Sequence, residues 1–499
     1  MVGAAVGMTA VDMAAVGMAA VGITAPWFWL SLALNQQTGS EIFSKLFGSE
    51  SIATLLESPF PPSPDYPYLG RFSICAGGPR QLDDGSLAMW TPESGKVLSF
   101  LRSLTVSSSP NLSNAPKDLP FVGGWLGWLG YDLAWEIESL PIQNNDELPF
   151  PVAFWYEPSS FAVLDHEAQV LWLAVSDELD WPDLLDRLTQ NQSTELTNSQ
   201  PIDSSLDNSA LASSVLGNSS VRFLTQQSEY EAAIVRAKQY IRSGDIFQTN
   251  ISLRFETETN RSSWDIYQAL QRINPSPFAS YWRSPFGDVV SCSPERLVSL
   301  DNDRIAQTRP IAGTRPRGQT TEEDLRLAIE LRSNEKECAE HIMLVDLERN
   351  DLGRVCEYGS VMVDELLAIE RYSHVMHLVS NVRGKLRSQF DAIDLIRATF
   401  PGGTITGCPK VRCMEIIEEL EPVRRSLFYG SCGYLDLRGQ LDLNILIRTL
   451  LYVPNQSGSA QVWGQVGAGI VADSVPSREW YESLQKATAQ LKALGEDVG

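Results

Sequence analysis

Two pairs of glutamates, each spaced three residues apart, stand in distant parts of the chain. Glu337 and Glu340 lie in a charged stretch that begins near Thr321 and runs into the apolar segment 342–345. On a helix, residues three apart point to the same side. Two close carboxylates repel each other unless a cation lies between them or one of them stays protonated. Such oxygen ligands suit Mg²⁺, and a solvated acidic helix face is the alternative explanation.

The second pair favours the metal over the solvated face. Glu479 and Glu482 are again three residues apart, and Lys486 follows one helical turn after Glu482. A metal shared by two helices needs one such pair from each helix. We therefore expect all four glutamates to meet around one Mg²⁺ ion, which binds through a few carboxylates, several waters and a substrate anion.

Two other stretches contain groups that bind anions. Arg448 lies in an apolar run, 445–450, that we expect to be a strand. A buried arginine needs an anionic partner, and its forked guanidinium fits a carboxylate; this partner is either an acid of the chain or a ligand. The backbone amides of Gly467, Ala468 and Gly469 could hold a carboxylate as a nest, with tight strand packing as the alternative.

Three more residues have side chains suited to chemistry. His377 lies in an alternating, strand-like run, where it is either a core histidine or a group for acid–base work. Glu295 follows a proline and precedes an arginine, so an ion pair between neighbouring elements is the alternative to a catalytic role. Thr404 lies in the glycine-rich segment 400–410, which leads into a helix whose N-terminus would attract an anion.

The composition excludes several classes of protein. A formal net charge of −23 over 499 residues argues against a nucleic-acid-binding protein. The seven cysteines are scattered without a CxxC pair, as in a protein with reduced thiols in the cytoplasm. The apolar residues 1–25 include Asp12 and lack a preceding basic segment, unlike a signal peptide or a membrane helix. We expect a disordered extension and no membrane association, with a membrane anchor as the alternative.

The polar segment 189–221 predicts a flexible linker between an N-terminal region, 26–188, and a C-terminal region, 222–499. The apolar pattern is irregular and lacks the even alternation of a parallel barrel. It predicts helices over 227–243, 321–342, 390–399, 409–420 and 477–495, strands over 246–255, 289–300, 441–453 and 467–471, and a hairpin over 161–175.

These stretches together resemble the chorismate-utilising enzymes, a family that includes anthranilate synthase component I, aminodeoxychorismate synthase component I, isochorismate synthase and salicylate synthase. The similar motifs span nearly all of 223–495, and the N-terminal half resembles the aminating members more weakly, through LLES at 55–58. The motifs are SPER at 293–296, RPIAGTRPRG at 309–318, ECAEHIMLVDLERNDLGRV at 337–355, RYSHVMHLVSNVRG at 371–384, FPGGTITGCPKVRCMEIIEELEP at 400–422 and VGAGIVADS at 466–474.

The resemblance implies an α/β (α+β) fold in which two antiparallel sheets pack as a sandwich with helices outside. It implies Mg²⁺ held by Glu340 and Glu482, with Glu337 and Glu479 helping through water. It also implies that chorismate binds this metal and that Glu295 and His377 flank its ring as catalytic groups. The substrate-binding groups implied by the family are Thr404, Arg448, Lys486 and the amides of Gly467, Ala468 and Gly469.

The product is the point on which the motifs divide. The PGGTITG and PFAS segments resemble aminodeoxychorismate synthase, which leads us to expect 4-amino-4-deoxychorismate, an intermediate of folate synthesis. Ala312 resembles the PIAGT form of anthranilate synthase, because many aminodeoxychorismate synthases have a nucleophilic lysine there. Leu56, Glu57 and Ser58 resemble the tryptophan-feedback motif of anthranilate synthases, so anthranilate is the alternative product.

The expected partners follow from this chemistry. The chain lacks the cysteine elbow and downstream His-x-Glu of a glutaminase, so we expect a separate glutamine amidotransferase subunit to supply ammonia. We expect no nucleic acid partner. A hypothesis of another class is a non-catalytic paralogue that binds tryptophan or a glutaminase and regulates it.

Overall fold

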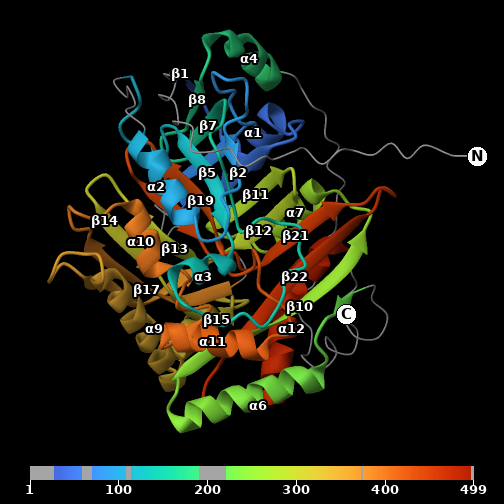
Figure 1. Cartoon of the computed structure of the whole chain (residues 1–499), viewed down its shortest axis with the longest axis vertical. Helices are drawn as coiled ribbons and strands as arrows, with labels where there is room; N and C mark the ends of the chain where they lie inside the picture. The colour runs from blue at the N-terminus through green and yellow to red at the C-terminus, as the bar shows by residue number, and fades with distance from the viewer. Residues whose placement is uncertain (1–26, 59–69, 108–113, 190–220, 373–374, 496–499) are drawn as a thin grey trace, which may run out of the picture.

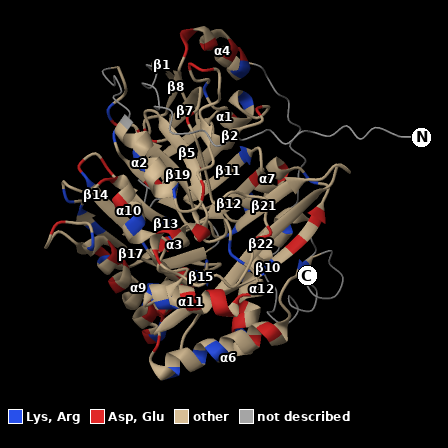
Figure 2. Cartoon of the chain, in the orientation of Figure 1, with Lys and Arg blue, Asp and Glu red and all other residues tan. Residues whose placement is uncertain are grey.

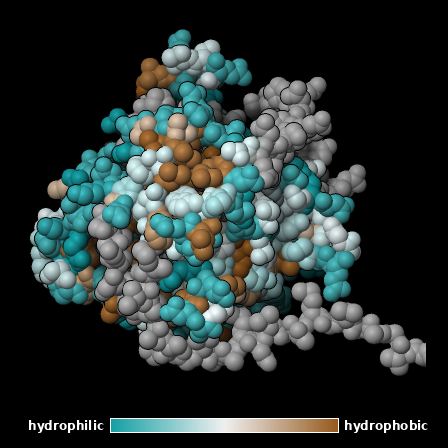
Figure 3. Space-filling model, turned by 90° about the horizontal axis from the view of Figure 1, so that it is seen from above, coloured by the Kyte–Doolittle hydropathy of each residue, from teal (hydrophilic) through white to brown (hydrophobic). Residues whose placement is uncertain are grey.

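The computed structural model describes residues 27–58, 70–107, 114–189, 221–372 and 375–495 (Figure 1). The predicted extension 1–25 and nearly all of the predicted linker 189–221 lie outside the described residues. Within those ranges, no helix is both long and apolar enough to cross a membrane. Seen from above, the surface is largely hydrophilic and carries a compact hydrophobic area near its centre (Figure 3).

The described strands form two antiparallel sheets, as predicted. The larger sheet has twelve strands, in the order β1-β8-β7-β3-β2-β11-β12-β21-β22-β10-β18, with β9 paired to β10. These strands are β1 (Phe28–Ala33), β2 (Ala53–Glu57), β3 (Phe72–Ala76), β7 (Ser160–Asp165), β8 (Val170–Val175), β9 (Arg222–Phe223), β10 (Gln248–Thr259), β11 (Phe278–Ser284), β12 (Gly287–Ser293), β18 (Gly407–Cys408), β21 (Thr449–Pro454) and β22 (Ala460–Ile470).

The smaller sheet has ten strands, in the order β15-β17-β14-β13-β20-β19-β5-β6-β4, with β16 paired to β17. Both sheets therefore contain strands from before and after the predicted linker. These strands are β4 (Met89–Trp90), β5 (Gly124–Leu129), β6 (Ala153–Tyr156), β13 (Arg296–Leu300), β14 (Ile305–Arg309), β15 (Ile311–Pro316), β16 (Met362–Arg371), β17 (Val375–Lys385), β19 (Ser431–Asp436) and β20 (Leu441–Asn444).

Helices cover the two sheets, as Figure 1 shows. Asp and Glu are prominent along the chain's outer helices, including α9, α11 and α12 (Figure 2). The helices are α1 (Gly39–Leu46), α2 (Val97–Ser107), α3 (Ala134–Ile137), α4 (Trp181–Thr189), α6 (Gln227–Ser243), α7 (Ser263–Ile273), α8 (Thr321–Ser333), α9 (Glu335–Gly353), α10 (Ala392–Thr399), α11 (Lys410–Leu420) and α12 (Pro476–Leu494).

The larger sheet is apolar on both faces because successive strand residues point to opposite sides. Trp282 of β11 and Val289 of β12 belong to one core cluster, which also contains residues of the smaller sheet. Their chain neighbours Tyr281 and Val290 belong to a second cluster, which contains residues of α1, α6, α7 and α12. One core thus lies between the sheets and the other lies between the larger sheet and these helices.

Several predicted elements are confirmed. Helix α6 has the predicted bounds and ends at Gly244, whose φ of 81° suits glycine because it has no Cβ. Helix α12 differs from its predicted range by one residue at each end. Strands β7 and β8 pair over their whole lengths, which confirms the predicted hairpin.

Three predictions of continuous elements are wrong. The helix expected over 321–342 is two helices, because the side chain of Asn334 accepts a hydrogen bond from the Glu337 N–H and starts a new helix. The strand expected over 289–300 is β12 followed by β13, and that expected over 441–453 is β20 followed by β21. In both cases the chain passes from one sheet to the other, a change that leaves the apolar pattern intact.

A buried ion pair fixes the loop that contains Thr404. Arg425 and Glu421 are both buried, and the Nη2 of Arg425 lies 2.6 Å from the Oε1 of Glu421. Arg425 also donates hydrogen bonds to the carbonyl oxygens of Ile405 and Asn250, at 2.8 and 2.9 Å. This guanidinium therefore ties the glycine-rich segment to the start of β10.

We predict that Arg425→Met lowers the free energy of unfolding by about 3 kcal/mol, because the carboxylate of Glu421 is then buried without its partner. Arg349→Met provides the control, since the Arg349–Asp346 pair is exposed and such pairs contribute under about 1 kcal/mol. Urea denaturation measures both values. Similar small losses for the two variants would contradict the prediction.

Candidate functional site

Two neighbouring crossovers between the sheets form the centre of the candidate site. Pro294 and Glu295 connect β12 of the larger sheet to β13 of the smaller one, and residues 445–448 connect β20 back to β21. The flanking strands pair, with Ser291 opposite Thr449 and Arg296 opposite Asn444. The N–H of Ile445 donates to the Glu295 carbonyl at 3.0 Å. The two crossovers therefore lie side by side.

Glu295 is a buried carboxyl group at the first crossover. Its polar neighbours include the Thr404 hydroxyl and the N–H of Ile311, which is 3.5 Å from its Oε1. Burial raises the pKa of Glu295 to about 7, although the hydrogen bond with Thr404 and the positive charge of Arg448 oppose this shift. A carboxyl group with such a pKa carries a proton at neutral pH part of the time and can act as an acid.

His377 lies on β17, between β15 and β16. Its Nδ1 is 2.9 Å from the hydroxyl of Thr314, its partner on β15. Burial, together with the charge of Arg448, lowers the pKa of His377 to about 3. The ring of Tyr372 stands beside the imidazole, with centroids 5.8 Å apart. His377 is thus neutral and fixed in orientation. The charge of Arg448 acts on both His377 and Glu295, so the three side chains belong to one site.

The prediction that Arg448 lies on a strand is wrong, because the residue lies in the break between β20 and β21. Its φ of 51° lies in the left-handed region, which the alternating strand pattern does not reveal. Its Nη1 donates to the Oδ1 of Asn274 at 2.8 Å. Among the residues that the structure describes, no acid of the chain forms an ion pair with this guanidinium.

Lys486 and the residues Gly467–Gly469 lie together at the end of β22. The ammonium of Lys486 donates to the Gly467 carbonyl at 2.9 Å and stands 3.0 Å from the Glu482 carboxylate. These residues pair with β10, whereas the pairing of β22 with β21 stops at Gly464. The backbone is an extended strand with one open edge rather than the expected nest.

Thr404 contributes a buried hydroxyl beside Glu295. Its Oγ1 is buried, and the carboxyl group of Glu295 is the polar group next to it. The preceding residue, Gly403, packs so closely that an added Cβ would lie 2.4 Å from a methyl carbon of Leu347. The glycine-rich loop therefore has little freedom to move away, and the hydroxyl stays beside Glu295.

The four glutamates occupy the predicted helices, and three of them, Glu337, Glu340 and Glu482, lie beside cations. Glu337 and Glu340 lie on α9, where Arg315 is 2.7 Å from Glu337 and Lys336 is 3.6 Å from Glu340. Glu479 and Glu482 lie on α12. No group of three or more His, Cys, Asp or Glu side chains within the described ranges is close enough to hold a metal ion. The shared Mg²⁺ site stays a prediction.

Two observations fit a cation at these carboxylates. Oε2 of Glu337 is buried and accepts no hydrogen bond from the described residues, and Oε1 of Glu340 is buried 3.6 Å from the Lys336 ammonium. Burial raises the pKa of Glu340, and the charges of Glu337 and Glu482 add to this shift. Burial likewise raises the pKa of Glu479, again with Glu482 contributing. A divalent cation would satisfy these oxygens and relieve the repulsion.

Gly313 lies between Glu337 and the strand position that faces His377. It forms a bulge on β15 between Ala312, which is opposite Leu378, and Thr314, which is opposite His377. Its φ is +64°, and an added Cβ would lie 2.2 Å from Oε2 of Glu337. Ala312, the residue expected to distinguish the two products, is therefore one position away from the contact with Glu337.

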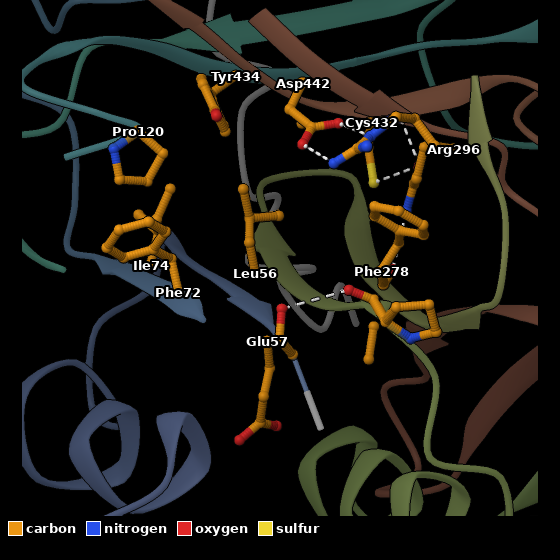
Figure 4. Close-up of a pocket in the computed structure, with 15 residues that line it drawn as sticks. Leu56, Glu57, Phe72, Ile74, Pro120, Phe278, Arg296, Cys432, Tyr434 and Asp442 are labelled. Carbon is orange, nitrogen blue, oxygen red and sulfur yellow. Dashed lines mark hydrogen bonds and ion pairs between the residues drawn. The ribbon is translucent and has the colours of Figure 1, made fainter. Parts of the chain in front are cut away.

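Leu56, Glu57 and Ser58 border a separate cavity of about 250 Å³ between the sheets (Figure 4). Leu56 faces the cavity with other apolar side chains, whereas the Glu57 carboxylate points away from it (Figure 4). That carboxylate accepts hydrogen bonds from the Ser40 N–H and hydroxyl and from the Tyr267 hydroxyl, at 2.7, 2.7 and 2.8 Å. Glu57 thus shapes the cavity by anchoring β2 instead of binding a ligand directly.

Sequence reasoning missed three residues of the site: Asn274, Gly313 and Thr314. Gly313 and Thr314 lie in the motif at 309–318, in which the sequence indicates a role only for Ala312. Asn274 precedes a proline and ends α7, which marks a turn but gives no sign of a contact with Arg448.

We predict that Gly313→Ala lowers the free energy of unfolding more than Gly95→Ala does. Both glycines have a positive φ, but no atom lies within 4 Å of a Cβ added at Gly95. The Gly95 change should cost about 1 kcal/mol from backbone strain alone. The Gly313 change adds the collision with Glu337 and should cost about 2–3 kcal/mol. Urea denaturation compares the two, and equal losses would show that Glu337 moves freely.

Several known proteins are similar to this chain in sequence and in fold. The model of the chorismate binding enzymes matches residues 66–492. The "Anthranilate synthase component I-like protein" of Synechocystis sp. (strain ATCC 27184 / PCC 6803 / Kazusa) is 60% identical over 473 residues, which cover 94% of this chain and 92% of that protein. "Aminodeoxychorismate synthase component 1" of Bacillus subtilis (strain 168) is 42% identical over 435 residues, covering 85% and 89%.

A solved structure, that of anthranilate synthase component I from Streptococcus pneumoniae TIGR4, superposes with a TM-score of 0.69 and 32% identity. The superposition covers 84% of this chain and 92% of that one. The chain therefore belongs to the family of chorismate-binding enzymes.

Proposed function

We propose that this chain aminates chorismate at C4 with ammonia, giving 4-amino-4-deoxychorismate and water. The observation that carries the proposal is Glu295, a buried acid whose pKa is raised to about 7 by burial, beside Arg448, a half-buried cation that has no ion pair with an acid among the described residues. The first can protonate a leaving hydroxyl, and the second can bind a carboxylate of the substrate.

The residues divide the work of the reaction. Glu295 gives its proton to the C4 hydroxyl, which leaves as water. The neutral ring of His377 can accept a hydrogen bond, and the added nitrogen loses its proton to water. Arg448, Lys486 and the amides along the open edge of Gly467–Gly469 hold the two carboxylates of chorismate. The hydroxyl of Thr404, beside Glu295, contributes a further hydrogen bond.

We also propose that Mg²⁺ is the cofactor. Glu340 and Glu482 would hold it, with Glu337 and Glu479 contributing through water. The support is the chemistry of the oxygen donors and the buried Oε2 of Glu337, which accepts no hydrogen bond from the described residues. A bound Mg²⁺ would offset negative charge that develops on the substrate.

The ammonia would come from a separate glutaminase. The names of the relatives, component I and component 1, are those of one part of a two-part enzyme. A chain of this family that lacks its own glutaminase would still use ammonia that is added directly.

Anthranilate is the second candidate product, because Ala312 offers no nucleophile for a covalent route to C4. In that reaction ammonia adds at C2, the C4 hydroxyl leaves as water, and pyruvate is lost. The cavity bordered by Leu56, Glu57 and Ser58 would then be a site for tryptophan as feedback inhibitor. Relatives with both names are similar to this chain at comparable identity, 42% for an aminodeoxychorismate synthase and 43% for an anthranilate synthase.

We expect incubation with chorismate, ammonium chloride and Mg²⁺ to give 4-amino-4-deoxychorismate. Liquid chromatography with mass detection separates this product from anthranilate. Anthranilate as the sole product would assign the chain to the second candidate. Absence of turnover by the folded protein would favour the non-catalytic, regulatory alternative.

Glu340→Ala tests the metal in the same assay. We expect the turnover number to fall at least about a hundredfold, because the ion loses a direct carboxylate ligand. Glu335→Ala is the matched control, since Glu335 is exposed on the same helix. Full activity of Glu340→Ala in a metal-free buffer would show that the glutamates bind no essential ion.

The pH dependence tests Glu295. Its protonated form is the active one, and its pKa is raised to about 7 by burial. We therefore expect kcat/KM for chorismate, measured at a constant concentration of free ammonia, to be constant at lower pH and to fall tenfold per pH unit above about pH 7. Glu295→Gln cannot titrate, so its slower reaction should lose this alkaline limb, with a rate about 10² to 10⁴-fold lower. A limb that persists unchanged in the variant belongs to another group.

A further inference from the structure

Arg448 differs from two other buried or half-buried arginines, Arg296 and Arg425, in the group that its guanidinium contacts. Arg296 lies 2.7 Å from the carboxylate of Asp442, and Arg425 lies 2.6 Å from that of Glu421. Arg448 instead donates to a neutral amide oxygen, the Oδ1 of Asn274, at 2.8 Å. Its positive charge is therefore not cancelled by this contact.

Asn274 is itself held firmly. Its backbone N–H closes the last turn of α7 by donating to the Leu270 carbonyl at 2.8 Å. Its Nδ2 is 3.1 Å from the Ser276 hydroxyl and 3.3 Å from the Cys292 carbonyl. The N–H of Cys292 in turn donates to the carbonyl of Arg448, at 3.2 Å. The side-chain amide of Asn274 and the backbone of Arg448 are thus both hydrogen bonded to Cys292, at the end of β12.

The chemical type of this partner matters. A carboxylate at the same place would form an ion pair with the guanidinium and compete with any incoming anion. An amide oxygen accepts a hydrogen bond from one N–H of the guanidinium and fixes the plane of the group. The guanidinium keeps its full positive charge, and its other N–H groups can still donate. A guanidinium prepared in this way can bind a carboxylate with two parallel hydrogen bonds.

We propose that Asn274 is a positioning residue for substrate binding, which aims Arg448 at a substrate carboxylate and preserves its charge by holding it through a neutral acceptor. The inference deepens the proposed function and rests on it, because the carboxylate is taken to be one of the two on chorismate. Asn274 makes no contact with the reacting atoms and acts through Arg448.

The test compares Asn274→Asp with Asn274→Ala by steady-state kinetics on chorismate with ammonium and Mg²⁺. Asp keeps the size and the acceptor but adds a competing charge, so KM should rise at least about tenfold, as expected for loss of one charge-assisted contact. Ala removes the acceptor and leaves the charge, so KM should rise about threefold. The turnover number should stay within about twofold in both, because the contact holds ground state and transition state alike.

The order of the two variants decides the outcome. A purely structural role predicts the opposite order, since Ala loses three side-chain contacts and Asp keeps some of them; that order, or an unchanged KM in Asn274→Asp, would overturn the inference. Asn455→Asp is the matched control, an exposed residue in the turn after β21, and it should leave KM unchanged.

Failure of the proposed function gives a different result. A wild-type protein that neither binds nor consumes chorismate would overturn that function. Calorimetric titration with benzoate, a simple aromatic carboxylate, then tests Arg448 directly. Weaker binding of benzoate to Asn274→Asp than to wild type supports the inference, and equal binding or no binding overturns it.

Discussion

The double crossover between the sheets is the constraint on which the candidate site depends. The chain changes sheets at Glu295 and changes back just before Thr449, and the flanking strands are hydrogen bonded to one another in both sheets. A lone side chain at a loop would have to be ordered by its own contacts. Here the two groups of opposite chemical character, an acid and a guanidinium, are placed by the strand register, and their positions follow from two sheets that form for other reasons.

The electrostatics of the site follow from this placement. The region between the sheets is apolar. Burial there raises the pKa of Glu295 and lowers the pKa of His377, since it disfavours the charged form of each group. Glu295 therefore carries a proton part of the time at neutral pH, and the imidazole is neutral. The positive charge of Arg448 opposes the first shift and adds to the second. A protein with a formal charge of −23 thus maintains a small region suited to an anionic substrate.

The sequence predicted those features that depend on local spacing. The helix positions of Glu337, Glu340, Glu479 and Glu482 follow from i, i+3 geometry, and the bounds of α6 follow from its apolar stripe and Gly244. The crossovers could not be predicted, because the run over 441–453 is equally apolar on both sides of its break. The left-handed backbone of Arg448 and its contact with Asn274, 174 residues away in the sequence, depend on tertiary packing. The resemblance to a family supplied the roles of the residues, and the structure supplied their surroundings.

Both halves of the chain share both sheets, and this has a consequence for any attempt to divide the protein. Strand β2 hydrogen bonds to β11, and β5 hydrogen bonds to β19, across the segment 190–220. A cut in that segment would give two fragments, each with two long, unprotected sheet edges. Such edges promote aggregation when they stand alone, so the fragments would need to be produced together to become soluble. The polypeptide is therefore one cooperative unit, although its composition suggests two separable ones.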